Sequence, residues 1–216
     1  MDKLIDQSTW SRKEIFDFFG TVSNPFYMVT FRQDVTPLYD YVKAHGLSFY
    51  YALVYLCSQA INHVPAFRYA VREGQVWQLA ERWPSFTDLR KGSELFHIVT
   101  LPCEGGMADF CRTAKEKSQS QQSFIDLSNE TDALIYFSCL PWVDLTALTN
   151  ERDLAAPGAR DEAIPHITWG KYVQEGERKV LGLSIEVNHR FIDGVHIGRF
   201  AAELTRSMEA LRDSSL

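Results

Sequence analysis

The chain has 216 residues, 45% hydrophobic and 23% charged, a balance typical of a globular protein rather than a disordered or fibrous one. Its 28 acidic and 22 basic residues give a formal net charge of -6, which argues against binding to nucleic acid. The polar N-terminus does not read as a signal peptide, no apolar run is long enough for a membrane span, and the four cysteines form no CxxC pair. We therefore expect one domain, residues 1–216, in the cytoplasm, with reduced thiols and no membrane or nucleic acid partner.

The first part of the chain predicts three helices and one strand. In chain order these are a helix starting near Ser11, a strand over 26–35, a helix over 36–46 and a helix over 48–64. The first helix starts with a serine that is followed three residues later by Glu14, the spacing of a capping box. The second has Gly46 past its end. The third is apolar on nearly all sides, so we expect it to be buried.

The remainder predicts several strands and two more helices. Alternating runs broken by turn residues predict antiparallel strands over 67–71, 75–80, 85–91 and 94–102. They are followed by a helix over 106–122, a strand over 132–143, a charged surface loop over 149–165, two strands around the turn at 175–177, and a helix from Asp193 to Leu211. In the last helix the apolar face comprises Val195, Ile197, Phe200, Leu204, Met208 and Leu211. This order indicates an α+β protein or a mixed two-layer sandwich.

Residues 180–194 contain the clearest chemical signal. The apolar residues of 180–188 alternate on one face of a strand, and His189 is the next residue on that face. Asp193 and Gly194 follow, which gives the pattern His-x-x-x-Asp-Gly across a strand-to-helix turn. A partly buried imidazole is neutral at cell pH and can act as a general base. The same pattern also fits a hydrogen-bonded core histidine beside an aspartate that caps the next helix.

Several segments, in the same order, resemble the trimeric chloramphenicol acetyltransferases of the HxxxDG, class A-like type. They are "WSRKEIFDFF", "SFYYALVYLCSQAIN", "SFTDLRKGSELF", "FSCLPWV" and "ITWGKYVQEGERKVLGLSIEVNHRFIDGVHIGRF", so the resemblance runs essentially end to end. It implies the CoA-dependent acyltransferase fold, a two-layer α/β (α+β) sandwich whose mixed, largely antiparallel sheet is covered by helices. It also implies an O-acetyltransferase that moves an acetyl group from acetyl-CoA to chloramphenicol, an antibiotic-resistance activity. The expected assembly is a homotrimer with its active sites between subunits.

The resemblance assigns a role to each candidate catalytic residue. His189 is the general base that takes the proton from the acceptor hydroxyl. Ser138 donates a hydrogen bond to the oxyanion, and Thr168 acts nearby through a bound water. Asp193 pairs with Arg12 and supports the turn that presents the base. Without the resemblance, Ser138 also fits a strand serine bonded to backbone, and Arg12 a solvated surface charge.

The resemblance also assigns the binding residues. Coenzyme A is expected along Trp142, Lys171 and Tyr172, although the two aromatic residues also fit ordinary strand positions, and a family lysine is replaced here by Ser48. The residues expected around the acceptor are mostly apolar: Phe19, Tyr27, Phe96, Ile98 and Phe124.

Two departures in that set leave the acceptor open. Phe19 stands where the family has tyrosine, and Ile98 is bulkier than the usual alanine. A different hydroxylated small molecule is therefore an alternative acceptor, and a non-catalytic binder of amphipathic aromatic molecules is a further alternative. No histidine pair has metal-ligand spacing with acidic or thiol partners, so we expect no metal.

Overall fold

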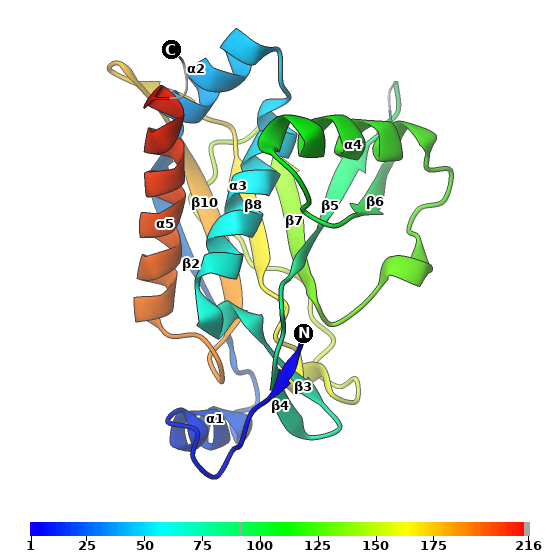
Figure 1. The fold of residues 1–216 in the computed structure, drawn as a ribbon, viewed down its shortest axis with the longest axis vertical. Coiled ribbons are helices and arrows are strands. Elements are labelled where there is room, and N and C mark those ends of the chain that lie inside the picture. The colour runs from blue at the N-terminus through cyan, green and yellow to red at the C-terminus, as the bar shows by residue number, and fades with distance from the viewer. Residues whose placement is uncertain (91, 214–216) are drawn as a thin grey trace.

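The computed structural model describes residues 1–90 and 92–213, in which a large sheet is covered by helices on one face (Figure 1). Its seven strands are β2 (Phe26–Asp34), β5 (Trp83–Leu89), β6 (Phe96–Thr100), β7 (Leu134–Leu140), β8 (His166–Gly170), β9 (Val173–Glu175) and β10 (Arg178–Asn188). They follow the order β2-β10-β8-β7-β5-β6, and β9 pairs with β10. The β5–β7 and β7–β8 pairs are parallel and the others antiparallel, so the sheet is mixed and largely antiparallel, as expected.

The helices form a layer over the sheet, and a smaller sheet lies at one end. The helices are α1 (Lys13–Gly20), α2 (Thr36–His45), α3 (Phe49–His63), α4 (Met107–Ser120) and α5 (Gly194–Asp213), with short 3-10 turns η1 (Pro65–Arg68), η2 (Leu127–Asn129) and η3 (Ala159–Asp161). Helix α3 lies between α4 and α5 in this layer, whereas α1 lies beyond the sheet at the end where β10 finishes (Figure 1). The small sheet has the order β1-β4-β3, from β1 (Lys3–Leu4), β4 (Gln75–Gln78) and β3 (Tyr69–Arg72).

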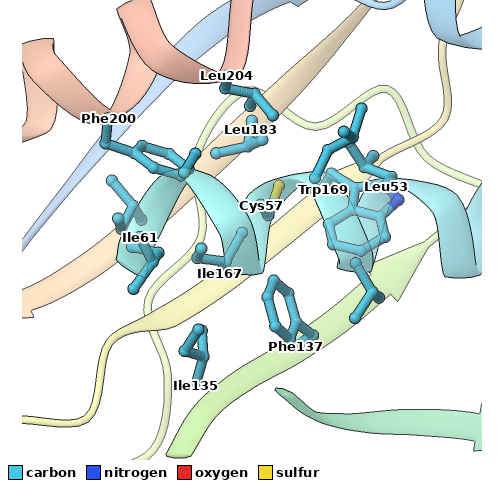
Figure 2. Close-up of a cluster of buried hydrophobic side chains, with 14 of the residues drawn as sticks. Leu53, Cys57, Ile61, Ile135, Phe137, Ile167, Trp169, Leu183, Phe200 and Leu204 are labelled. Carbon is cyan, nitrogen blue, oxygen red and sulfur yellow. The ribbon is translucent and has the colours of Figure 1, made fainter. Parts of the chain in front are cut away.

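The core lies between the helical layer and one face of the sheet (Figure 2). Side chains of α3 and α5 pack there against alternate residues of β7, β8 and β10, namely Leu53, Cys57, Ile61, Phe200, Leu204, Phe137, Ile167, Trp169 and Leu183. Each is at most 2% exposed. Full burial of one such side chain stabilises the fold by about 1.5–3 kcal/mol. The alternation predicted for residues 180–188 is confirmed, since Leu181, Leu183, Ile185 and Val187 are buried on this face.

The other face of the sheet is covered by the segment that follows β7. A Cβ at Gly170 would lie 2.5 Å from the Val143 carbonyl oxygen, and one at Gly182 would lie 1.9 Å from the Leu145 carbonyl oxygen. The Ser184 hydroxyl donates to the Leu148 carbonyl at 3.2 Å. Glycine at these two positions therefore lets the chain lie directly on β8 and β10. The loop expected over 149–165 has little regular structure, but part of it covers the sheet instead of projecting into solvent.

Most predicted elements are present, with local differences. The first helix has Arg12 at its N-cap instead of Ser11, so the predicted capping box is wrong, and the guanidinium, which only donates hydrogen bonds, leaves the first turn without a side-chain cap. Gly46 ends α2 with φ of 65°, the left-handed conformation that glycine adopts without strain. Val195 was expected on the buried face of the last helix but is 56% exposed, because it lies in the first turn, beyond the core. The strand expected over 85–91 ends at Leu89, and Lys91 lies outside the described residues.

Candidate active site

His189 follows directly after the last residue of β10 and lies between two aromatic rings. Its backbone N–H donates to the Pro25 carbonyl at 2.8 Å. The Phe19 ring stacks on the imidazole, with 3.9 Å between centroids and 22° between planes. The Tyr27 ring lies 4.5 Å from the imidazole centroid at a tilt. These two rings hold the imidazole in one orientation. The His189 side chain is 35% exposed, so a substrate can still reach it.

The surroundings of His189 favour its neutral form. Partial burial is the largest cause that lowers the pKa of His189, because an imidazolium loses hydration there. The Asp193 carboxylate opposes this effect, and the Arg12 guanidinium adds to it. Burial also raises the pKa of Tyr27 to about 12. At neutral pH the site therefore contains an unprotonated imidazole beside a protonated phenol.

Arg12 binds the turn between β10 and α5 through several hydrogen bonds. Its Nη1 lies 2.5 Å from Asp193 Oδ2, and its Nη2 lies 2.8 Å from Asp193 Oδ1. The same guanidinium donates to the backbone carbonyls of His189 at 2.9 Å and Arg190 at 2.7 Å. The hydrogen bonds from Arg12 are the largest cause that lowers the pKa of Asp193. His189 Nε2 lies 3.4 Å from Asp193 Oδ1, but this carboxylate is already neutralised by an arginine.

Ser138 and Thr168 lie side by side on the face of the sheet that points away from the helices. Ser138 pairs with Thr168 in the parallel β7–β8 register, and Thr168 pairs with Ser184 across β8–β10. Their sequence neighbours Phe137, Ile167 and Trp169 point into the core, so the two hydroxyl side chains point the opposite way (Figure 2). Thr168 is 2% exposed, whereas Ser138 is half-buried.

Ser138 lies on the wall of a pocket of about 590 Å³. Four more of the predicted residues line it, namely Phe96, Trp142, Lys171 and Tyr172. Trp142 is 72% exposed and lies at the rim. Phe49, Tyr50 and Trp169 also line this pocket, and the sequence assigned none of them to a site. Phe49 and Tyr50 lie in the first turn of α3, which the sequence predicted as a buried helix. Their place at the end of that helix was the only sequence signal that could have assigned them to a pocket.

The predicted acceptor residues divide between two places. Phe96 and Phe124 are in edge contact at 5.5 Å, and the Ile98 N–H donates to the Phe124 carbonyl at 2.7 Å. These three residues lie on the Ser138 side. Phe19 and Tyr27 instead contact the His189 ring.

One chain does not bring His189 and Ser138 together. The register aligns Ser138 with Ser184, and His189 lies five residues beyond Ser184 along β10. At about 3.3 Å per residue and about 4.8 Å per strand, the two Cα atoms are about 19 Å apart. Side chains stand roughly perpendicular to a sheet, so rotamer changes do not close this gap. In Figure 1 β8 lies between β7 and β10, which run in opposite directions.

Two further findings concern the described part of the chain. Within residues 1–90 and 92–213, no group of three or more histidine, cysteine, aspartate or glutamate side chains is placed to hold a metal ion. Among the same residues, no helix has both the length and the apolar character needed to cross a membrane.

Comparisons with known proteins agree on one family. The sequence model of the family described as chloramphenicol acetyltransferase matches residues 2–205. Chloramphenicol acetyltransferase 2 of Escherichia coli is 28% identical over 199 residues, which cover 91% of this chain and 92% of that protein. The chloramphenicol acetyltransferase of Clostridium perfringens is 28% identical over 204 residues, covering 93% and 95%.

Solved structures support the same fold. A chloramphenicol acetyltransferase structure superposes with a TM-score of 0.85 at 23% identity, over 96% of this chain and all of that one. The cubic core of the pyruvate dehydrogenase multienzyme complex superposes with a TM-score of 0.64 at 19% identity, over 94% of this chain and 88% of that one. The CoA-dependent acyltransferase fold is thereby confirmed. The chain belongs to the chloramphenicol acetyltransferase family of acetyl-CoA-dependent acyltransferases.

Proposed function

We propose that this protein acetylates a hydroxyl of chloramphenicol at sites formed between the subunits of a homotrimer. The observation that carries the proposal is the division of the predicted site into two separate halves. One half contains His189, Phe19 and Tyr27, and the other contains Ser138 with its pocket. Each half lacks what the other provides, so a reaction that needs both draws on two copies of the chain.

Exposed apolar side chains at both halves support such an assembly. Beside the Ser138 pocket, large apolar residues are 47% to 72% exposed, namely Phe96, Val143, Phe124, Leu95 and Trp142. Beside the His189 half, Phe18 is 64% exposed and contacts Phe19. Apolar surface of this kind marks an interaction site. Two different surfaces that join head to tail close into a ring when the rotation allows it, and a trimer is the smallest such ring beyond a dimer.

The proposed reaction is a direct transfer without an acyl-enzyme. His189 accepts the proton of the acceptor hydroxyl as its oxygen forms a bond to the thioester carbonyl carbon of acetyl-CoA. The carbonyl electrons move onto the oxygen, and the Ser138 hydroxyl of the neighbouring subunit donates a hydrogen bond to this oxyanion. Collapse of the intermediate breaks the carbon–sulfur bond, and the CoA thiolate takes the proton back from the His189 imidazolium. The products are the acetyl ester and CoA.

The remaining predicted residues support this step. The Thr168 hydroxyl lies beside Ser138 on the same face, where it can hold a water near the oxyanion. Arg12 and Asp193 hold the turn that presents His189 and take no part in proton transfer, because their charges neutralise each other. The pocket with Trp142, Lys171 and Tyr172 takes the pantetheine arm of acetyl-CoA. Its aromatic walls suit a long, mostly uncharged chain.

The cytoplasm is the proposed location, and each subunit is proposed to be one domain. All four cysteines are free thiols, which suits a reducing compartment.

A second acceptor is favoured by the residues that line the acceptor side. Phe19 stacks on His189 where the resemblance places a tyrosine, so one hydroxyl is missing beside the base. Ile98, whose N–H donates to the Phe124 carbonyl and which lines a small separate pocket, is larger than the alanine that the resemblance places there. Both changes support a different hydroxylated small molecule as the second candidate acceptor.

The direct test is CoA release from acetyl-CoA with chloramphenicol and a panel of hydroxylated amphiphiles. We expect turnover with at least one acceptor and its loss in His189→Ala by about 10²–10⁴-fold. Binding of the acceptors without any CoA release would support the non-catalytic binder instead. Full turnover in His189→Ala would remove the proposed base.

A further inference from the structure

Helix α1 carries Phe19 in its last turn, and the position of that turn decides whether the ring stays on the His189 imidazole. The two rings are close to parallel, with 3.9 Å between centroids. Arg12 fixes only the start of this eight-residue helix, about 10 Å along the axis from Phe19. The buried Phe16 ring packs against Trp10 and Phe191 in the middle of the helix, so the last turn needs a contact of its own.

Arg190, the residue after His189, makes that contact. Its guanidinium carbon lies 3.7 Å from the centroid of the Phe16 ring, and its Nε donates to the Phe16 carbonyl at 3.2 Å. The edge of the guanidinium lies against Gly20, where a Cβ would be 3.2 Å from Nη2. The Arg190 side chain is 11% exposed, so these contacts are largely shielded from water.

The same guanidinium is held from its other side by the η3 turn. Arg190 Nη1 forms an ion pair with Asp161, and Arg160 donates to the Gly20 carbonyl. The Asn188 side chain donates to the backbone carbonyls of Arg160 and Glu162, both at 2.9 Å. Its Oδ1 also accepts from the Arg190 N–H at 3.0 Å. The end of β10, the η3 turn and the last turn of α1 are thus joined in one network with Arg190 at its centre.

We propose that Arg190 is a positioning residue for acetyl transfer: it locks the last turn of α1 onto the His189 turn and so keeps the Phe19 ring stacked on the imidazole. This inference rests on the proposed role of His189 as the base. Arg190 acts through Phe16 and Gly20, and its side chain is directed to α1 and η3. A lysine keeps the charge but lacks the planar guanidinium that stacks on the Phe16 ring while bonding the Phe16 carbonyl and Asp161, so it does not replace this arginine.

Loss of the stack has a defined effect on the base. Phe19 excludes water from one face of the imidazole, and burial is the largest cause of the lowered pKa of His189. The charged and titratable groups around the ring are Arg12 just before α1, Tyr27 from β2, Asp193 from the turn and, behind it, His196 from α5. Of these, Asp193 raises the pKa of His189 and Arg12 lowers it. When the Phe19 ring leaves, water returns and the pKa of His189 rises.

The test compares Arg190→Met and Arg190→Lys with the control Arg206→Met, which removes an exposed arginine paired with Glu203 on α5. The rising limb of kcat/KM against pH reports the pKa of the base in the free enzyme. For both Arg190 variants we expect this limb to move to higher pH and kcat to fall by about tenfold, a part of what general-base catalysis contributes. The KM for acetyl-CoA stays unchanged, since its pocket lies at the other half of the site. The control keeps the wild-type profile.

A double-mutant cycle with Phe19→Ala separates positioning from general loosening. If Arg190 acts through Phe19, Arg190→Met shifts the pH limb in the wild type but adds no shift in Phe19→Ala, because the effects of coupled residues do not add. An equal shift in both backgrounds overturns the proposal. So does a wild-type pH profile in a folded Arg190 variant.

Titration of the His189 ring protons by NMR gives the same answer without turnover, with the signal assigned by its absence in His189→Gln. If Arg190→Met does not fold, Arg190→Lys and Asp161→Asn carry the same cycle. If His189→Ala is inactive but the Arg190 variants keep the wild-type pH profile, only the positioning role of Arg190 is refuted. An active His189→Ala removes the proposed base itself.

Discussion

Mixing two inactive variants should restore activity if each active site takes its halves from two subunits. His189→Ala removes the base but leaves the Ser138 half intact, and Ser138→Ala does the reverse. Within one chain the two residues are about 19 Å apart along the sheet, so neither lesion reaches the other half of the same subunit. A hybrid trimer then contains some sites with both intact halves.

The expected recovery follows from counting. In a ring of randomly mixed subunits at equal amounts, a site takes an intact His189 with a chance of about one half and an intact Ser138 with a chance of about one half. About a quarter of the wild-type activity should therefore return, and it should follow the product of the two mole fractions as their ratio is varied. If each site lay within one chain, every site would carry a lesion, and activity would stay below about 1%, since loss of an oxyanion donor costs about 10²–10³-fold.

The assay is CoA release after the variants are unfolded together and refolded, with each variant refolded alone and the wild type refolded in parallel. Two different affinity tags allow hybrid trimers to be isolated. A mixture that is no more active than the average of the separate variants would refute the shared site. Recovery in samples mixed without unfolding would indicate that subunits exchange between trimers. The activity would then again rise to at most about a quarter of the wild-type activity.

The remaining predictions concern the residues that support the site. Arg12→Met should cost about 3 kcal/mol of unfolding free energy, the low end for breaking a buried pair because Asp193 is 31% exposed. Since the pKa of Asp193 is lowered in the folded state, this stabilisation is present above the ordinary aspartate pKa and is lost as pH falls through the lowered value. In denaturant titrations the difference in unfolding free energy between Arg12→Met and the wild type should therefore shrink in acid. The control Lys13→Met removes one partner of an exposed ion pair and should change the unfolding free energy by less than about 1 kcal/mol at any pH. Gly182→Ala should lower the free energy of unfolding by about 1–3 kcal/mol or more, because the new Cβ would overlap the Leu145 carbonyl. Gly198→Ala, in open space on α5, should raise it by about 0.5–1 kcal/mol. Equal melting temperatures for the two variants would contradict this. Ser138→Ala alone should lower kcat by about 10²–10³-fold with little effect on the melting temperature, and a wild-type kcat would exclude an oxyanion role.

Local patterns account for the parts of the fold that the sequence predicted. The alternation over 180–188 gives β10, because a strand with one buried face repeats every second residue. Gly46 marks the end of α2, since the left-handed conformation there disfavours a side chain. The position of β7 between two parallel neighbours was not predictable in this way, because it depends on pairing between segments far apart in the chain.

The residue pattern alone indicated His189 with Asp193 and Gly194, and the rest of the candidate site was predictable only as far as the family resemblance assigned its residues. The contact between Arg12 and Asp193 was expected from it and is present. Arg190 was not singled out, because an arginine inside the His-x-x-x-Asp-Gly pattern carries no signal of its own. Its role depends on how close Gly20 lies, and that distance is set by the packing of α1 rather than by spacing in the sequence.

The two faces of β10 connect these observations. Its apolar residues build the core, as the alternation indicates, but the intervening polar residues are also buried, with Ser184, Glu186 and Asn188 at most 5% exposed. Buried polar groups need hydrogen-bond partners, and here the partners come from the long segment after β7. Glu186 binds Arg152 and the Asn150 N–H, and Asn188 binds the η3 turn. Because η3 in turn holds Arg190 and the end of α1, the polar face of β10 places the groups that surround His189. One strand thus provides the stability of the core through one face and the geometry around the base through the other.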